Sequence, residues 1–188
     1  AALTPAGPVI AYRDRSQDEI RDISVIRKTS GGWSDPVRVA EDNWKIAGCP
    51  VNGPSVATAN NTIAIAWLTL TPANDGLIKF ATSHDGGETF TPAIQLNQTP
   101  ASEEVAVVGR VDVLIDPHGK ASVSWVAKHG EHFAVHLTTI SADGVANDAV
   151  AFLAPDTPTT TPHLVRSEGG LVVMWSNRTQ TFLTPLAP

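Results

Sequence analysis

Pro54–Trp67 reads PSVATANNTIAIAW, and this stretch decides the fold because the chain repeats its plan. Val111–Trp125 reads VDVLIDPHGKASVSW and Pro162–Trp175 reads PHLVRSEGGLVVMW. Each copy has a short run of apolar residues in alternation, a polar turn, a second such run and a tryptophan. Alternating runs bounded by Gly, Pro, Asn and Asp are typical of β-strands. Each copy therefore predicts a β-hairpin that ends on an aromatic anchor.

A fourth, partial copy lies at the N-terminus, where PVIAYRD supplies a second strand with Tyr12 at the anchor position. The anchors Tyr12, Trp67, Trp125 and Trp175 follow one another at intervals of 55, 58 and 50 residues. Each anchor is followed by a third strand, a tight hairpin and a short fourth strand. A repeat of this length with four strands is typical of the blades of a β-propeller. A β-sandwich has a similar density of strands, but it would not repeat one hairpin with the same aromatic.

We therefore predict an all-β chain, a β-propeller of four-stranded antiparallel blades. About three and a half blades are present. The chain is expected to form a single propeller domain or a partial propeller over 1–188, with blades at about 1–45, 46–100, 101–155 and 156–188. The first blade is expected to lack its innermost strand, and the last to lack its outer strand.

The hairpin after the second anchor, SHDGGETF, fits the Asp-box pattern S-x-D-x-G-x-x-W/F in every position. Ser83 and Asp85 are expected to bond the backbone of their own turn, Gly87 to take a positive φ, and Phe90 to pack into the blade. We assign this box a structural role. Partial versions occur at 30–33, which lacks the Asp, and at 141–144, which lacks the aromatic.

On this motif and the repeat, the chain resembles the sialidase-like BNR/Asp-box superfamily of β-propellers. The segments YRDRSQDEIRDIS (12–24), GCPVNGP (48–54) and GRVDV (109–113) are similar to bacterial proteins described as exo-α-sialidases. The resemblance implies six blades in the complete propeller. It also implies a periplasmic or extracellular location and a retaining glycoside hydrolase that acts on glycan-linked sialic acid or a related acidic sugar.

Composition excludes several other classes of function. The net charge is −6 and no Lys/Arg cluster is present, which argues against a nucleic-acid partner. No apolar run approaches the roughly 20 residues of a membrane span, and the N-terminal residues have no leader pattern, as expected of a mature sequence or the interior of a longer protein. Cys49 is the only cysteine, so a disulfide within the chain is excluded. We expect no cofactor and no metal, because no D-x-D loop for calcium is present.

Propeller topology sorts the loops between two faces. If the Asp-box hairpins lie on one face, the loops from second to third strands and between blades lie on the other. In sialidase-like proteins this second face holds the active site. The loops that it collects are 13–22, 43–53, 71–76, 98–110, 128–132, 155–163 and 176–180.

The first of these loops, RDRSQDEIRD, offers Arg13, Arg15 and Arg21 as ligands for the carboxylate of a sugar. Arg13 and Arg15 flank Asp14, so they are expected to share one side of the strand end. The alternative is a solvated loop with surface ion pairs, each of little energetic value.

Arg110 and Asp112 lie at the start of the innermost strand of the third blade, and their spacing places both on one face. We expect them at the mouth of the propeller channel, where Asn52 and His163 would line the same ring. The alternative is a salt bridge between blades. Trp44 can stack on a sugar ring or, alternatively, fill the space between two blades.

Two other residue groups are weaker candidates. Cys49 is expected to be a small buried hydrophobe. His129 and His132, with Glu131 between them, could form a metal site, but the signal is weak because a third ligand of fixed geometry is missing.

A glycosidase needs an acid/base carboxylate as well as an anion site, and we assign the former to Asp14 or Asp112. The only tyrosine, Tyr12, occupies an anchor position inside a strand and is unsuited to act as the sialidase nucleophile. The Arg-Ile-Pro motif of sialidases is absent. A hydrolase that is completed elsewhere, a non-catalytic propeller that binds a glycan or a protein, and a purely structural domain therefore remain open. Expected partners are a glycan or another small molecule, and either a second copy of the chain or the remaining blades.

Overall fold

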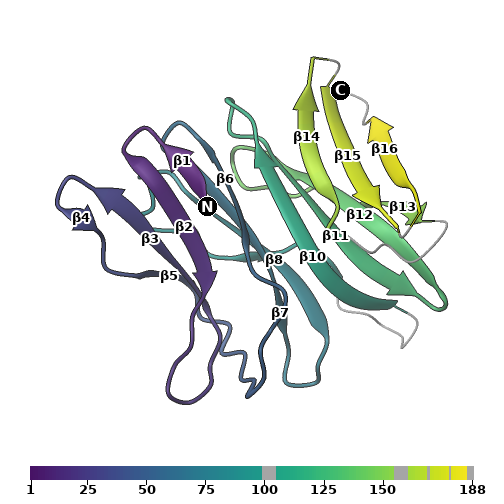
Figure 1. The fold of residues 1–188 in the computed structure, drawn as a ribbon, viewed down its shortest axis with the longest axis horizontal. Helices are drawn as coiled ribbons and strands as arrows, with labels where there is room; N and C mark the ends of the chain where they lie inside the picture. The colour runs from purple at the N-terminus through teal and green to yellow at the C-terminus, as the bar shows by residue number, and fades with distance from the viewer. Residues whose placement is uncertain (99–104, 155–160, 169, 178, 186–188) are drawn as a thin grey trace.

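The structure, a computed structural model, describes residues 1–98, 105–154, 161–168, 170–177 and 179–185. These residues form four antiparallel sheets that follow one another along the chain (Figure 1). Sheet 1 contains β1 (Ala2–Thr4), β2 (Gly7–Arg13), β3 (Ile23–Thr29), β4 (Gly32–Trp33) and β5 (Val37–Ala40). Sheet 2 contains β6 (Ser55–Ala59), β7 (Thr62–Leu70), β8 (Gly76–Ser83) and β9 (Ile94–Gln95). Sheet 3 contains β10 (Val105–Ile115), β11 (Ala121–His129), β12 (His132–Ile140) and β13 (Val150–Ala154), and sheet 4 contains β14 (His163–Ser167), β15 (Gly170–Ser176) and β16 (Thr181–Pro185).

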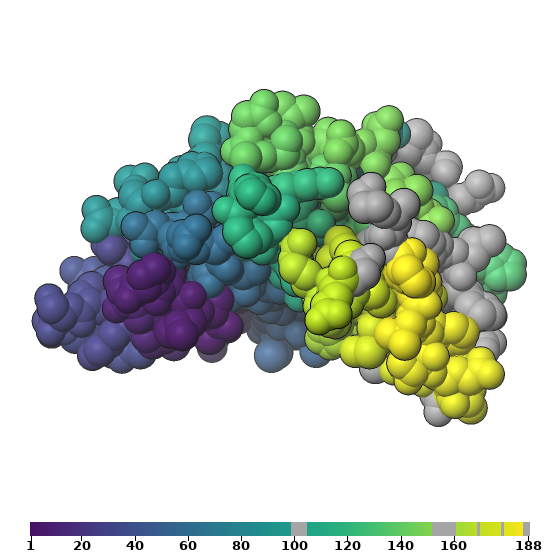
Figure 2. Space-filling model, turned by 90° about the horizontal axis from the view of Figure 1, so that it is seen from above, coloured from purple at the N-terminus to yellow at the C-terminus, as the bar shows by residue number. Residues whose placement is uncertain are grey.

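The prediction of an all-β chain made of four-stranded antiparallel blades is confirmed. Each strand pairs with the next along the chain, except that β5 joins the side of β3. The first strands of successive sheets lie beside one another, with contacts from β1 to β6, from β6 to β10 and from β10 to β14. Sheets 1 and 4 lie at opposite ends of the molecule, as the view from above shows (Figure 2). No helix among the described residues is long and apolar enough to cross a membrane.

Two expected boundaries are wrong. The first sheet does have an innermost strand, because Ala2–Thr4 pairs with Gly7–Val9 across a two-residue turn. This strand is too short to show an alternating pattern. The predicted loop 98–110 is too long, because β10 begins at Val105. Gly109 and Arg110 both have positive φ, which resembles a loop, but the strand absorbs them in a bulge.

The three tryptophan anchors occupy one register position. Each pairs with a residue of the third strand: Trp67 with Lys79, Trp125 with His136 and Trp175 with Phe182. Each faces the preceding sheet and is 5% exposed or less. The opposite faces of the middle strands are also apolar, so that separate cores fill the spaces between sheets 1 and 2, 2 and 3, and 3 and 4. Burial on both faces explains why β7 reads as a nearly continuous apolar run.

The Ser83–Phe90 hairpin is closed by its own side chains. Asp85 Oδ1 accepts hydrogen bonds from the backbone N–H groups of Glu88 and Thr89, at 2.9 and 3.0 Å. Ser83 Oγ accepts one from the N–H of Gly87, at 2.8 Å, and Gly87 has a φ of 96°. Phe90 packs against the core between sheets 1 and 2. The hairpin is therefore built as its sequence predicts.

The two partial versions of this hairpin are looser. Trp33 is 49% exposed and does not join the core. Ser141 hydrogen-bonds with the carboxylate of Asp143 and with the backbone of Val145, which closes the turn without an aromatic contact.

Candidate functional site

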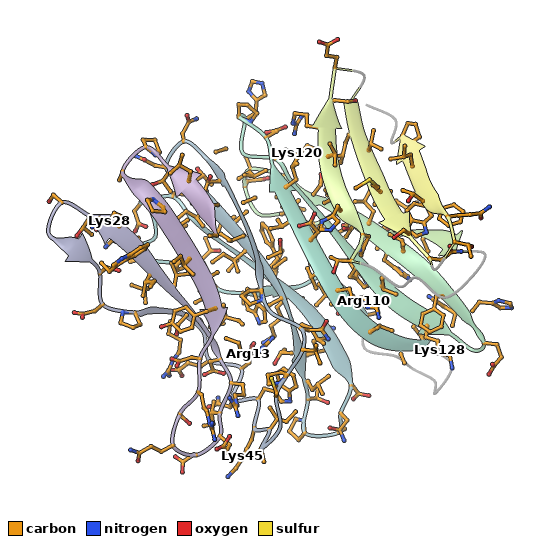
Figure 3. All side chains as sticks on the ribbon, viewed as in Figure 1. Arg13, Lys28, Lys45, Arg110, Lys120 and Lys128 are labelled. Carbon is orange, nitrogen blue, oxygen red and sulfur yellow. The ribbon has the colours of Figure 1, made fainter. Side chains whose placement is uncertain are left out.

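Among the loops predicted to share one face, 13–22, 43–53, 71–76 and 128–132 lie along the lower edge of the sheets in Figure 1. Figure 3 shows Arg13, Lys45, Arg110 and Lys128 toward this edge, whereas Lys28 and Lys120 lie toward the other. The first strands of the sheets contact one another across sheets and carry several of the predicted site residues.

Ser55, Asp112 and His163 occupy equivalent positions on the first strands of sheets 2, 3 and 4. Each pairs with the residue before a tryptophan anchor. Asp112 Oδ1 accepts a hydrogen bond from Ser55 Oγ at 2.8 Å, and Oδ2 accepts one from the backbone N–H of Leu164 at 2.8 Å. His163 Nδ1 lies 3.6 Å from the same Oδ2. The Asp112 carboxylate therefore links three successive sheets.

Arg110 lies two residues before Asp112, in the bulge of β10. Its φ is 53°, a left-handed conformation that costs a residue with a Cβ about 1–3 kcal/mol. The Asn52 side chain holds this backbone in place: its Oδ1 accepts from Arg110 N–H at 3.1 Å, and its Nδ2 donates to Val108 O at 3.1 Å. Gly109 has a φ of 90°, and a Cβ there would approach the Asn52 amide to 2.9 Å. Bulges of this kind re-aim side chains and are frequent next to active sites.

Arg13 is largely buried and donates all its recorded hydrogen bonds to backbone carbonyls. The acceptors are Arg21 O at 2.8 Å, Leu68 O at 2.6 Å and Asn52 O, which both Nε and Nη2 reach at 3.2 Å. Its guanidinium carbon lies 4.6 Å from the ring centroid of buried Trp44. Burial lowers the pKa of Arg13 to about 10, although nearby carboxylates oppose this. Arg13 thus joins sheets 1 and 2, and the buried Trp44 ring lies against its guanidinium.

The other two arginines of the first loop are held elsewhere. Arg15 and Arg21 each bond one carboxylate oxygen of Glu19, at 2.6 and 2.7 Å. The Arg15 side chain is 64% exposed, and that of Arg21 is 12% exposed. Arg13 and Arg15 thus have different partners, because Arg13 contacts the Trp44 ring and backbone carbonyls whereas Arg15 pairs with Glu19.

Asp14 is tied to its own loop. Its Oδ1 accepts from Arg15 N–H at 2.7 Å, and its Oδ2 accepts from Ser24 Oγ at 3.2 Å. Neither carboxylate that the sequence offered as an acid/base, Asp14 or Asp112, is therefore without hydrogen-bond partners. Cys49 is exposed, contrary to expectation, because its turn projects from the loop between sheets 1 and 2.

Sequence reasoning missed Asp42. Its side chain is 1% exposed and accepts from Trp67 Nε1 at 2.6 Å while it pairs with Lys79 Nζ. Nothing in the sequence distinguishes Asp42 from its exposed neighbour Glu41, and Lys79 alternates with apolar residues as a solvated lysine would.

Sequence reasoning also missed the contact of His129 with His136, whose Nε2 atoms are 2.9 Å apart. The candidate metal group is not assembled, since Glu131 and His132 are exposed. The described residues hold no group of three or more His, Cys, Asp or Glu side chains suited to a metal ion. Parts of the predicted loops, 99–104 and 155–160, lie outside the described residues.

No family model and no curated protein matches the chain. Solved structures do. The Hadza microbial sialidase Hz136 matches with a TM-score of 0.64 and 15% identity over 97% of this chain and 43% of that chain. A mutant of NanB sialidase from Streptococcus pneumoniae matches with a TM-score of 0.54 and 12% identity, over 93% of this chain and 26% of that chain. A thermostable family-43 glycoside hydrolase matches with a TM-score of 0.50 and 14% identity, over 90% of this chain and 64% of that chain. The chain shares the propeller-type fold of these glycoside hydrolases, and it spans less than half the length of either sialidase.

Proposed function

We propose that this chain forms part of a sialidase-like propeller of the BNR/Asp-box type and that it binds the acidic group of a glycan through Arg110. The observation that carries the proposal is the left-handed backbone of Arg110, held by the Asn52 amide inside a first strand. A conformation that costs stability and has a dedicated clamp suggests that the direction of this side chain matters. A guanidinium is suited to hold a carboxylate with two parallel hydrogen bonds.

Binding without hydrolysis is the function that the described residues support best. Asp112 joins three sheets and Asp14 closes its own loop, so each carboxylate is already used within the fold. Arg13 and Trp44 likewise contact each other and the backbone. These contacts support a scaffold role for all four residues.

Hydrolysis of a sialic-acid glycoside is the second candidate. It is favoured by the likeness to two sialidases, of which this chain spans 43% and 26%. In that case the acid/base and the nucleophile would come from further blades. Such an enzyme would act on glycans outside the cytoplasm, in the periplasm or in the medium.

Further blades are also the partner that we propose for the two end sheets. On sheet 1 the face turned away from sheet 2 carries Ile10, Tyr12 and Ile26, and on sheet 4 Val165 and Leu183 are 45% and 65% exposed. Between the other sheets, faces of this kind are buried as core. If the chain sediments as a discrete dimer, the partner of these end sheets is a second copy of the chain and not further blades.

The test is binding of sialyllactose, with lactose as the neutral control, measured by saturation-transfer NMR on the chain. Arg110→Gly removes the guanidinium while keeping a residue that accepts positive φ, so it should abolish the difference between the two sugars without unfolding the protein. Arg166→Ala, on exposed β14, is the matched loss of charge and should change nothing. Equal binding by wild type and Arg110→Gly would refute the proposal. Release of 4-methylumbelliferone from its sialic-acid conjugate would show turnover and favour the second candidate.

A further inference from the structure

A cleft with a volume of about 710 Å³ lies between sheets 2 and 3, and the start of β10 contributes Val105 and Val107 to its lining. Sheet 3 lines it with Trp125, His129 and His136, and sheet 2 lines it with the end of β9 and the residues that follow, 95–98. The loop segment 146–149 closes one side. Asp148 is the only other titratable side chain among the described residues that line it.

The equivalent place between sheets 1 and 2 is filled by a carboxylate. There Asp42 accepts a hydrogen bond from the Trp67 indole at 2.6 Å and pairs with Lys79, the residue opposite Trp67. The Asp42 side chain is 1% exposed. Asp42 precedes its tryptophan by 25 residues, and the residue at the same spacing before Trp125 is Pro100. The sequence therefore does not repeat a carboxylate at this spacing, and the carboxylates of the corresponding loop, Glu103 and Glu104, precede Trp125 by 22 and 21 residues.

The partners of that carboxylate have counterparts in sheet 3. His136 is opposite Trp125, as Lys79 is opposite Trp67, and the two rings stack with centroids 5.3 Å apart. No hydrogen bond joins the Trp125 indole to another described residue. Sheet 3 thus has an indole N–H and an imidazole at the two positions where sheet 2 has an indole N–H and an ammonium group.

His129 adds a second imidazole. The planes of His129 and His136 differ by 8°, and the centroid separation of 5.2 Å exceeds the Nε2 separation of 2.9 Å by about the width of one ring. The two rings therefore meet edge to edge, with one Nε2 donating a hydrogen bond to the other. The lone pairs of both nitrogens point along the line between them, and 2.9 Å is too short for a metal ion on that line at about 2 Å from each. Two facing imidazoles that gain a second proton instead attract an anion.

We propose that this cleft binds the carboxylate of a small ligand, in the place that the Asp42 carboxylate takes between the preceding sheets, with Trp125 and His136 as its partners. The site is separate from Arg110 and does not depend on the function proposed above. Burial, with a contribution from His129, lowers the pKa of His136 to about 4. A bound carboxylate favours the protonated imidazole, so binding strengthens as the pH falls. Asp148 also lines the cleft, and its carboxylate opposes the binding of an anion.

The experiment is calorimetric titration of the chain with acetate and with glucuronate at constant ionic strength, with glucose as the neutral probe. Histidine ring resonances are followed by NMR in parallel. Both anions should bind, glucose should not, and the affinity should fall at least about tenfold from pH 5 to pH 7 because proton uptake is linked to binding. The resonances of His129 and His136 should shift together on addition of acetate. Absence of that shift at pH 5 would overturn the proposal.

Two variants place at position 136 the residue type that lies opposite the tryptophan anchor in sheet 4 or sheet 2, so we expect both to fold. His136→Phe copies Trp175 and Phe182, whose rings stack at 5.4 Å, and should lose the response to acetate. His136→Lys copies the pair in sheet 2 and should bind acetate with little dependence on pH between 5 and 7. His118→Ala, at an exposed turn, is the control and should behave as the wild type.

Two results would count against the site, and one separates it from the function proposed above. Acetate binding by His136→Phe equal to that of the wild type would overturn it. So would a change in the His136 titration on replacing Glu103 and Glu104 by Gln without added ligand, because a carboxylate of the chain itself would then fill the cleft. Arg110→Gly should keep the acetate response whether or not the first-strand site binds a glycan.

Discussion

Replacement of Arg13 by Met tests whether this arginine holds the sheets together or binds a ligand. The substitution keeps an unbranched side chain of similar length over Trp44 but removes every donor. Three carbonyls then lose their partner: Arg21 O, Leu68 O and Asn52 O. A buried carbonyl left unpaired costs about 1–3 kcal/mol, and water can reach part of this site, so we take the lower end for each. Loss of the contact with the Trp44 ring adds about 0.5–1 kcal/mol.

The expected loss is therefore about 3–4 kcal/mol of unfolding free energy. For a chain of this size the midpoint of thermal unfolding should fall by about 6–15 °C. Urea denaturation followed by tryptophan fluorescence measures the free energy directly. Arg15→Met is the matched control, because Arg15 is exposed and pairs only with Glu19, and it should cost less than about 1 kcal/mol. Equal stabilities of the two variants, with glycan binding lost only in Arg13→Met, would refute the reasoning and make Arg13 a ligand residue.

Three further changes are expected to alter stability in defined directions. The pKa of His136 is about 4 in the folded chain and about 6.5 unfolded, so the stabilisation of the folded chain by the neutral imidazole is complete above pH 6.5 and is lost as the pH falls toward 4. Because the ring is partly exposed, we expect the free energy of unfolding to fall by about 1 kcal/mol by pH 5. Urea midpoints of His136→Phe should lack this loss. Burial raises the pKa of Asp85, but hydrogen bonds from Thr89 and the rest of its turn outweigh burial and hold this pKa well below its usual range. The stabilisation by the ionised Asp85 is therefore present above pH 4 and is lost on further acidification. Asp85→Ala should lower the free energy of unfolding by about 1 kcal/mol at pH 7, and urea denaturation of this variant should lack the acid dependence. Asp42→Ala leaves Lys79 and the Trp67 indole unpaired and should cost about 3 kcal/mol in calorimetry, whereas a loss below 1 kcal/mol would show that water replaces the carboxylate.

The fold could be predicted from the sequence because its main signal is a repeat of buried residues. A tryptophan that must face the preceding sheet recurs once per blade, and the alternating runs around it mark the hairpin. The strand Ala2–Thr4 was missed because three residues cannot establish an alternation. The start of β10 was missed because Gly109 and Arg110 carry the backbone signature of a loop within a strand.

The candidate site was predictable only in part, because residue type and parity do not determine contacts. The sequence predicted that Arg110 and Asp112 share one strand and that Asn52 and His163 lie nearby. The structure places all four on first strands or in the residues just before them. It could not show that Arg13 folds back over Trp44 while Arg15 turns to Glu19. That difference depends on carbonyls 8, 39 and 55 residues away, which no local pattern encodes.

The contrast among Lys79, His136 and Phe182 explains why the cleft between sheets 2 and 3 escapes a reading of the sequence. The three residues share no chemical class and differ in spacing from their anchors, so only strand pairing reveals that each lies opposite a tryptophan. Once they are aligned, sheet 2 has a cation with its own carboxylate and sheet 4 has an apolar ring. The Trp175 indole is buried without a partner among the described residues. Among the described residues, only those of sheet 3 combine a titratable ring at this position with a second histidine and a cleft. A repeat that keeps its hydrophobic anchors while varying the residue opposite them can therefore acquire a binding site in one blade without disturbing the others.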